Sequence, residues 1–305
     1  MREPAGKQWP LSLFFAFAFF LISIFLGRCY GSVNRPIPEM TLFNLSSQVA
    51  IMEILPIPGP YLWLKANGGV IASGGVVSAW QDQSGNQNHV FGQATYVPGA
   101  LSGMPVVRFS SSANDQLQAS TGVQFFTSAN QGLTVFTVFN TSDPNNQRFL
   151  LTLYLGHCST NIELGYMVDQ VNAGDYGLHL GCGAGSVSPS GTILSGSYYL
   201  MTLRVMTAGG APGNIEIFQN GNPLAVGAAN GGTWLSAGSY GTTAGLLTIG
   251  ARGNLVPPEF GLFDAFHDGD IAEIILYRSA LSDSDRISLE CFLSQKYGLT
   301  VSGCP

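Results

Sequence analysis

One stretch near the end of the chain has the features of a strand followed by a capped helix, and no other part shows helical periodicity. The run from Ile271 to Tyr277 is rich in strand-forming residues and ends shortly before Ser282. Ser282 suits an N-cap, acidic residues follow it in the first turn, and Gly298 suits the position just after the last turn. A chain with one terminal helix and 39 glycines must build most of its core from sheets joined by tight turns.

The predicted helix has one apolar face, formed at helical spacing by Leu289, Phe292, Leu293 and Tyr297. We expect this face to pack on a sheet of the same domain rather than to form a groove for a partner protein.

Short apolar runs recur along the rest of the chain between breaks rich in Gly, Ser, Thr and Asn. The predicted strands are 61–66, 76–80, 106–109, 133–139, 149–155, 163–168, 198–206, 215–218, 224–226, 246–249 and 271–277. Asn220-Gly221 lies between two of them and is the strongest short signal for a hairpin. The sequence therefore predicts an all-β fold, a two-sheet antiparallel sandwich with one C-terminal helix.

The first residues have the pattern of an export signal. Arg2 and Lys7 precede an apolar run of 16 residues, from Leu11 to Leu26. This run is shorter than the about 20 residues that a bilayer span needs and suits a signal peptide. We expect residues 1–31 to be a signal peptide, with a retained signal anchor or lipid attachment at Cys29 as alternatives. The protein is then secreted or on the cell surface, with a proline-containing lead-in (32–60) and one domain (61–305).

Four cysteines follow the leader: Cys158, Cys182, Cys291 and Cys304. An exported chain meets oxidising conditions, so an even number of cysteines predicts disulfide bonds. Three pairings are open, and we expect the local one, Cys158–Cys182 and Cys291–Cys304. The second bond would tie the C-terminal tail to the terminal helix. The spacing of these cysteines does not favour a zinc site.

The charge balance argues against a nucleic-acid partner. The chain has 12 basic and 18 acidic residues, a net charge of −6, and no basic run. A membrane is expected as a partner only if the leader is retained. The motifs of common hydrolases, zinc proteases and phosphate-binding loops are absent from the sequence.

Three blocks of sequence carry a resemblance to a known family. They are Leu62–Ala66, then Val77–His89 with Gly103–Phe109 behind it, and finally Gly269–Gly298. The second block contains the pattern Trp-x-Asp-x-Ser-Gly-Asn, from Trp80 to Asn86. In this order the blocks resemble the laminin G-like branch of the concanavalin A-like lectin/glucanase superfamily. The resemblance covers about residues 61–299.

The resemblance implies a two-sheet jelly roll of the kind typically used to bind glycans or glycoproteins. It does not imply catalysis, because function depends on the site and not on the fold. Glycanases of this superfamily carry acidic residues alternating along one strand. Here Glu163, Glu216 and Glu273 each lack an acidic partner two or four positions away on the same strand.

Two polar clusters are the candidate sites. The first contains Asp82, Ser84, Asn86 and His89, and the second contains Asp264, His267, Asp268 and Asp270. Carboxylates from both loops (Asp82, Asp264, Asp268 and Asp270) are candidate calcium ligands. The second cluster could also bind sugar hydroxyls, with Phe260, Phe263 and Phe266 stacking on sugar rings. The alternatives are a tight turn in the first case and a solvated loop over packed phenylalanines in the second.

We expect an exported, non-catalytic module that binds carbohydrate or a glycosylated surface through Asp82, Asn86, His89, Asp264, His267 or Asp268. Calcium is the one cofactor that these loops would suit. A structural or adhesive protein that contacts other proteins is the main alternative, and a glycan-cleaving enzyme is less favoured. Asn44 and Asn140 begin N-glycosylation sequons, which matter only if the source is a eukaryote.

Overall fold

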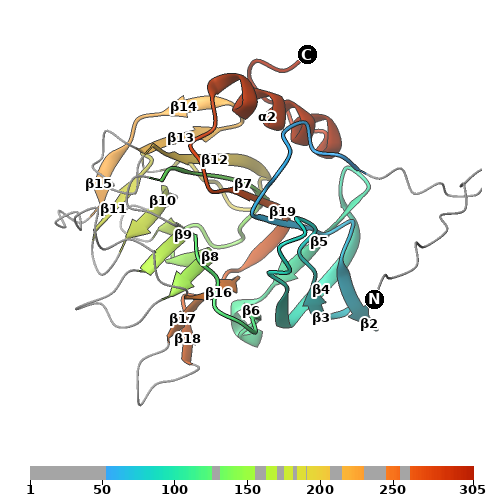
Figure 1. The fold of residues 1–305 in the computed structure, drawn as a ribbon. Helices are drawn as coiled ribbons and strands as arrows, with labels where there is room; N and C mark the ends of the chain where they lie inside the picture. Colours follow the sequence, from blue (N-terminus) through green and yellow to red (C-terminus); the bar gives the residue numbers. More distant parts are fainter. Residues whose placement is uncertain are drawn as a thin grey trace, which may run out of the picture. The chain divides into compact units, whose positions relative to one another are not determined.

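The computed structural model describes residues 53–125, 131–154, 163–169, 175–180, 184–189, 191–206, 215–229, 245–254 and 262–305. This part of the chain is an antiparallel β-sandwich with one C-terminal α-helix, α2 (Asp283–Tyr297), which confirms the predicted fold class (Figure 1). The expected leader, Asn44, Cys158, Cys182 and Phe260 lie outside the described residues. In the described part, no helix is long and apolar enough to span a membrane.

One sheet of the sandwich carries α2 on its outer face, and we call it the helix-covered sheet. Its antiparallel strands follow the order β1 (Leu62–Lys65), β19 (Gly269–Tyr277), β7 (Leu133–Phe139), β12 (Tyr199–Val205), β13 (Ile215–Gln219) and β14 (Asn222–Leu224). All seven residues of β7 are buried. Alternate side chains point to opposite faces, so Phe139 packs between the sheets while Phe136 packs under α2. A strand covered on both faces loses the alternation of polar and apolar residues.

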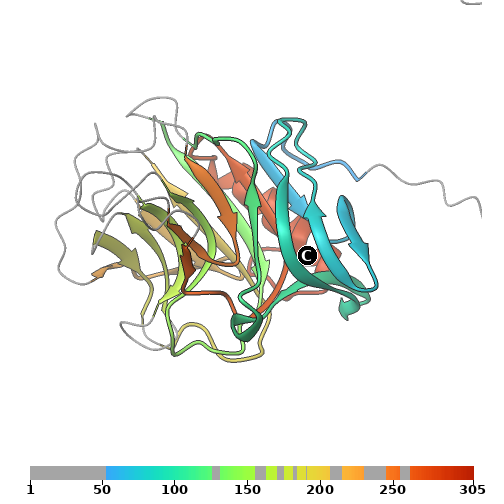
Figure 2. The same ribbon diagram turned by 90° about the horizontal axis from the view of Figure 1, so that it is seen from below.

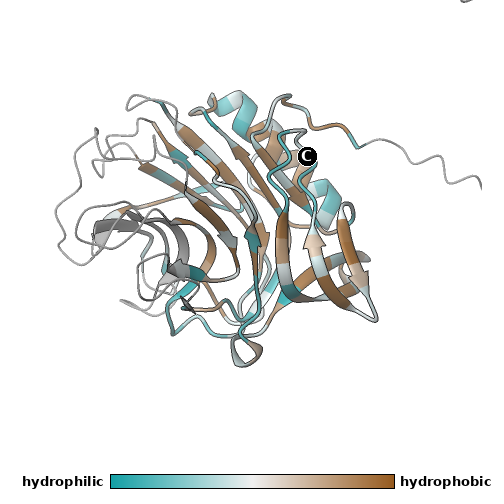
Figure 3. Ribbon diagram, turned by 60° about the horizontal axis from the view of Figure 1, so that its bottom comes forward, coloured by the Kyte–Doolittle hydropathy of each residue, from teal (hydrophilic) through white to brown (hydrophobic). Residues whose placement is uncertain are grey.

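A second sheet forms the other layer of the sandwich (Figure 2). Its order is β6 (Gln116–Ala119), β16 (Leu246–Ile249), β8 (Arg148–Tyr154), β9 (Glu163–Asp169), β10 (Asp175–Leu180), β11 (Ala184–Val187) and β15 (Gly227–Ala229). Figure 2 shows these strands in a separate layer from those of the helix-covered sheet. In Figure 3 apolar residues run along the strands, and hydrophilic residues mark the outer turns of α2.

A long strand, β4 (Val90–Leu101), links the two sheets. It pairs with β3 (Val76–Trp80), β5 (Met104–Phe109) and β6, and β3 pairs in turn with the edge strand β2 (Val70–Ser73). A short 3-10 turn, η1 (Ser111–Ala113), follows β5, and β17 (Arg252–Asn254) pairs with β18 (Leu262–Asp264) in a separate hairpin. The sequence did not predict β4, because Gly92, Pro98 and Gly99 interrupt its strand-forming residues.

The terminal helix has the predicted caps and the predicted disulfide bond. The Ser282 side chain accepts a hydrogen bond from the Asp285 amide, and Gly298 adopts a left-handed conformation at the C-terminus. Leu289, Leu293 and Tyr297 are buried against the helix-covered sheet. The bond Cys291–Cys304 is present, with 5.1 Å between the Cα atoms, so the C-terminal tail is tied to α2.

The Asn220-Gly221 hairpin is confirmed as well. Both residues have positive φ, 47° and 77°, as a type I′ turn requires. Gln219 pairs directly with Asn222, so β13 and β14 are joined by a two-residue loop. The second strand ends at Leu224, two residues before the predicted end.

A charged network lies beneath α2. Glu273 of β19 is almost completely buried and accepts hydrogen bonds from Trp63 Nε1 at 2.5 Å, Lys296 Nζ at 2.6 Å and Tyr297 Oη at 2.7 Å. Lys296 also pairs with Glu53 at 2.6 Å, so the end of the lead-in is fastened to the helix. Every charge in this network faces an opposite charge or a donor, as buried charges require. Glu273 therefore has a structural role: its hydrogen bonds attach α2 to the helix-covered sheet.

Candidate ligand-binding groove

The first candidate loop is held together by the carboxylate of Asp82. Asp82 is 5% exposed, and its Oδ1 atom accepts hydrogen bonds from the amides of Trp63 and Ser84, both at 2.9 Å. Its Oδ2 atom accepts from Ser84 Oγ at 2.7 Å and from the Asn88 amide at 3.0 Å. Four donors of the protein thus occupy the carboxylate. These contacts support the tight-turn interpretation of Asp82 rather than a role as a calcium ligand.

Asn86 and His89 also serve the loop itself. Asn86 Nδ2 donates to the carbonyl oxygens of Pro60 and Tyr61, at 3.2 Å and 3.1 Å. His89 Nδ1 accepts a hydrogen bond from the Asp82 amide at 3.0 Å, which places the ring proton on Nε2. The loop therefore fastens the entry of β1 to β3.

The second candidate cluster is split by the structure. Asp264 is exposed on β18 and pairs with Arg252 of β17. His267 is fully buried, whereas Asp268 and Asp270 line a groove. Within the described ranges, no group of three or more His, Cys, Asp or Glu residues is placed to hold a metal ion. The four expected calcium ligands, Asp82, Asp264, Asp268 and Asp270, therefore form no such group in the described part of the chain. Asp264 and Asp270 are paired with Arg252 and Arg108.

The groove lies where four chain segments meet at one end of the helix-covered sheet. These segments are the ends of β5 and β7 and the residues just before β12 and β19, which adjoin because the strands are antiparallel. The groove has a volume of about 330 Å³. Its lining residues are Arg108, Phe109, Ser110, Asn140, Ser142, Gly196, Asp268, Gly269 and Asp270.

An ion pair between β5 and β19 forms one wall of the groove. Arg108 and Asp270 are directly opposite each other across the two strands. Arg108 Nε donates to Asp270 Oδ1 at 2.6 Å, and Nη2 donates to Oδ2 at 3.0 Å, which is a two-point contact. This hydrogen bonding raises the pKa of Arg108 above its ordinary value. The Asp270 side chain is 2% exposed and that of Arg108 is 51% exposed, so the guanidinium presents its outer edge to solvent.

Tyr198 and Asn140 are further hydrogen-bond partners of Asp270. Tyr198 Oη donates a hydrogen bond to Asp270 Oδ2, and Asn140 Nδ2 lies 3.5 Å from the same atom. Asn140 Oδ1 accepts from the Asp270 amide at 2.8 Å. Burial, followed by the contact with Asp270, raises the pKa of Tyr198 above its ordinary value.

Backbone contacts set the shape of the groove beside Asp268. The Asp268 carbonyl accepts hydrogen bonds from the Ser142 amide at 2.7 Å and from Thr141 Oγ1 at 3.2 Å. The next residue, Gly269, has a φ of 156°, and a Cβ atom there would lie 2.4 Å from the Asn140 carbonyl oxygen. Only glycine permits this close approach between the two loops. The Asp268 carboxylate is partly exposed and accepts one hydrogen bond, from the Ser111 amide at 3.1 Å.

His267 lies under the groove and does not line it. Its ring packs edge-on against Phe109 and Phe139, with ring centres 6.2 Å and 6.3 Å away. Burial lowers the pKa of His267 to about 4, although the Asn140 backbone and the nearby Asp268 act in the opposite direction. His267 is therefore a neutral core residue at physiological pH, and it supports the groove from below.

Sequence reasoning missed most of the groove. Arg108 was placed on a predicted strand, but its pairing with Asp270 depends on a strand register that the sequence does not reveal. Asn140 was identified only as a sequon, yet its amide faces Asp270 inside the groove. No sequence feature indicated that Tyr198 contacts Asp270; the residue was only expected to begin a strand.

The sequence matches no protein-family model and no curated protein. Several solved structures are similar to it at low identity. Domain 4 of an extracellular arabinanase from Geobacillus stearothermophilus, in complex with arabinotriose, has a TM-score of 0.49 and 13% identity, over 76% of this chain and 97% of that domain. A sialidase from Trypanosoma rangeli has a TM-score of 0.48 and 18% identity, over 94% of this chain.

A third similar structure is the CBM40 domain of a Ruminococcus gnavus sialidase bound to α2,3-sialyllactose. Its TM-score is 0.38 and its identity 16%, over 55% of this chain and 95% of that domain. The chain spans only 39% of the length of the T. rangeli sialidase. None of these TM-scores reaches 0.5 and none of the identities reaches 20%, so these likenesses assign neither a ligand nor an activity to this chain.

Proposed function

We propose that this protein is an exported, non-catalytic module that binds neutral carbohydrate in the groove beside Arg108, Asn140 and Asp268. One observation carries the proposal. Arg108 and Asp270 are paired with each other, whereas Asp268 forms no ion pair with a described residue, and free donor and acceptor atoms remain at the surface of the groove. Among the described residues, Arg108 Nη1 and Asp268 Oδ2 make no hydrogen bond.

This arrangement is complementary to neighbouring hydroxyl groups. A guanidinium donates hydrogen bonds and cannot accept them, whereas a carboxylate only accepts them. A sugar hydroxyl does both, so one hydroxyl can accept from Arg108 while its neighbour donates to Asp268. Binding pockets for small molecules commonly combine a concave surface of this size with a few polar groups that fix orientation.

The charges that line the groove favour a neutral ligand. Arg108 contributes one positive charge, and Asp268 and Asp270 contribute two negative charges. Because Asp270 already neutralises Arg108, a carboxylated or sulfated sugar would meet the unpaired charge of Asp268. Like charges at close range disfavour binding.

Catalysis is disfavoured by the same contacts. Asp268 and Asp270 line one groove, which is the arrangement that glycan hydrolysis needs. Asp270, however, accepts hydrogen bonds from Arg108, Tyr198 and Asn140, which supports a role in holding the groove together rather than in bond cleavage. A tyrosine acting as a general base needs a lowered pKa, whereas the pKa of Tyr198 is raised.

A glycan array of matched pairs tests this function. Each neutral oligosaccharide is printed beside its sialylated and sulfated derivatives, and the recombinant protein is applied with calcium and with chelator. We expect saturable binding to a related set of neutral glycans, weaker binding to their acidic derivatives, and no loss in chelator. A flat array with folded protein would refute carbohydrate binding, and turnover of a bound glycan would refute the non-catalytic role.

One observation favours a second candidate function, adhesion to another protein. Ile71, Val76 and Phe91 lie on the neighbouring strands β2, β3 and β4 and are 48%, 53% and 45% exposed. Exposed apolar side chains on adjacent strands can form a contact with another protein. A flat glycan array together with saturable binding to a protein surface, lost in Ile71→Ser and Phe91→Ser, would favour this alternative.

A further inference from the structure

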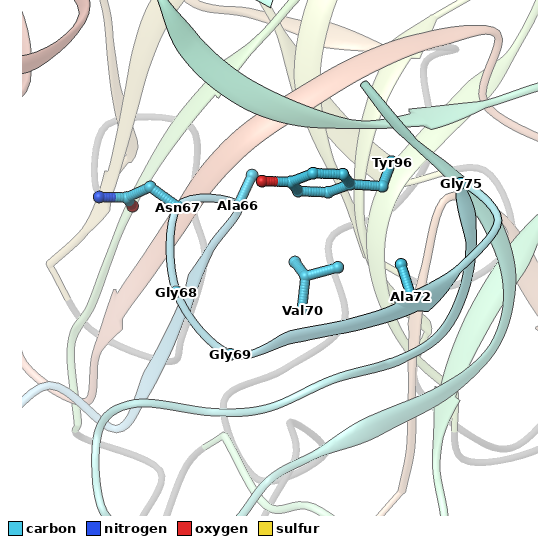
Figure 4. A pocket seen from close by; sticks show the side chains of 8 residues that line it. All are labelled: Ala66, Asn67, Gly68, Gly69, Val70, Ala72, Gly75 and Tyr96. Carbon is cyan, nitrogen blue, oxygen red and sulfur yellow. The ribbon is translucent and has the colours of Figure 1, made fainter. Parts of the chain in front are cut away.

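We infer that a cavity beside Tyr96 is a second carbohydrate subsite, which takes one neutral pyranose ring. The inference rests on the proposed function for its ligand class, but it uses none of the residues of the groove. The cavity has a volume of about 490 Å³ and lies between β2, the turn that precedes it, and β4. Figure 4 shows its lining side chains.

One wall of the cavity is aromatic and the opposite wall is aliphatic. The Tyr96 ring lies across the cavity, and Val70 and Ala72 point toward it from β2 (Figure 4). The Tyr96 amide donates to the Gly75 carbonyl at 2.7 Å, which fixes the tyrosine backbone over the β2–β3 hairpin. The ring is only partly buried, and its hydroxyl makes no hydrogen bond with any described residue. A ring face and a free hydroxyl therefore meet at one cavity.

The rim of the cavity consists mainly of backbone. Gly68, Gly69 and Gly75 line it, and a Cβ atom on Gly75 would meet nothing within 4 Å. Gly75 therefore leaves open space at the rim that a side chain would otherwise fill. Asn67 Nδ2 donates to Glu53 Oε2 at 3.2 Å, so its Oδ1 atom is left as an acceptor at the rim.

A pyranose ring has the matching chemistry. Its C–H groups form an apolar face that suits the negative face of an aromatic ring, and its hydroxyls form a polar edge that suits Asn67 Oδ1 and the Tyr96 hydroxyl. None of the described residues that line the cavity is charged, so a neutral ring is favoured over an acidic one. A purely apolar ligand would offer no partner to the Asn67 Oδ1 atom or to the Tyr96 hydroxyl.

The test uses methyl β-D-glucopyranoside and methyl β-D-galactopyranoside as probes in saturation-transfer NMR. Tyr96→Ala removes the aromatic wall, and Ala72→Leu fills the cavity from an exposed strand position. Ser73→Leu is the matched control, since Ser73 is the exposed neighbour of Ala72 and does not line the cavity. We expect binding of at least one probe to weaken about three- to tenfold in Tyr96→Ala, as loss of an aromatic contact implies, and likewise in Ala72→Leu.

A control in the groove separates this inference from the proposed function. Ser142→Tyr places a ring in the groove without changing the Tyr96 cavity. Probe binding that survives Ser142→Tyr but falls in Ala72→Leu, with Ser73→Leu unchanged, supports the second subsite. Binding that is lost in Ser142→Tyr and unchanged in Tyr96→Ala and Ala72→Leu refutes the second subsite and leaves the groove intact. If neither probe binds the wild-type protein, the subsite is refuted for pyranose rings.

Discussion

Replacing His267 with leucine should make the protein more resistant to acid. The imidazole of His267 is fully buried, and neither ring nitrogen forms a well-aligned hydrogen bond with the described residues. The groups facing it are the rings of Phe109 and Phe139, with Asp268 and Asp270 nearby. Burial disfavours the charged form, so the pKa falls from 6.5 to about 4 in the folded state.

The sign and size of the effect follow from proton linkage. The unfolded chain binds a proton at His267 below about pH 6.5, whereas the folded protein resists it until about pH 4. Unfolding is therefore favoured progressively as the pH falls through this window. The loss is small at pH 7, about 2 kcal/mol at pH 5 and about 3 kcal/mol at pH 4. His267→Leu removes this loss while keeping an apolar side chain in the core.

Urea unfolding at neutral and acidic pH measures the effect. The free energy of unfolding is determined for both proteins at pH 7 and at pH 5, so that other titrating groups, such as Asp115 and Glu290, cancel in the difference. We expect the wild-type protein to lose about 2 kcal/mol more than His267→Leu between these values. An equal loss in both proteins would show that His267 is not buried in the neutral form and would refute this account of its environment.

Three further predictions concern the loop of Asp82, the C-terminal disulfide and the Asn140 sequon. Asp82→Asn should lower the free energy of unfolding by about 2–4 kcal/mol, because an amide group would face two or more donors, and glycan binding of the folded protein should not change. Unchanged stability in urea would contradict the structural role. Replacing Cys291 and Cys304 with serine should cost about 3 kcal/mol by chemical denaturation, given a sequence separation of 13; no loss would mean that the bond does not constrain the unfolded chain. In protein secreted from a eukaryotic host, molecules glycosylated at Asn140 should be absent from the glycan-bound fraction by mass spectrometry, because Nδ2 faces Asp270 in the groove; their equal presence in both fractions would place the ligand elsewhere.

Local signals in the sequence predicted the features that depend on neighbouring residues. The caps of α2, its buried face, the Asn220-Gly221 turn and the bond Cys291–Cys304 all involve residues close in sequence. Strand β7 was also evident, because a run of apolar residues of that length suits a strand covered on both faces.

The groove could not be predicted in the same way. Arg108 and Asp270 are 162 positions apart, and only the register between β5 and β19 brings them together. The meaning of Asp82 was left open for a similar reason, since one of its donors is the amide of Trp63, on another strand. The calcium expectation stays a prediction, and the sequence did not show that Asp270 and Asp264 are paired with Arg108 and Arg252. The family resemblance, the leader and the pairing of Cys158 with Cys182 stay predictions.

The central claim is that the groove beside Arg108 binds the ligand, and one pair of variants tests it directly. Ser142 and Asn145 are exposed residues of the same loop, but only Ser142 lines the groove. Titration calorimetry with the neutral glycan that binds most strongly on the array would compare Ser142→Tyr and Asn145→Tyr with the wild-type protein. We predict that Ser142→Tyr weakens binding about tenfold or more, which is roughly 1.4 kcal/mol, and that Asn145→Tyr leaves it unchanged. Wild-type affinity in Ser142→Tyr would contradict the account, because a filled groove cannot hold a sugar.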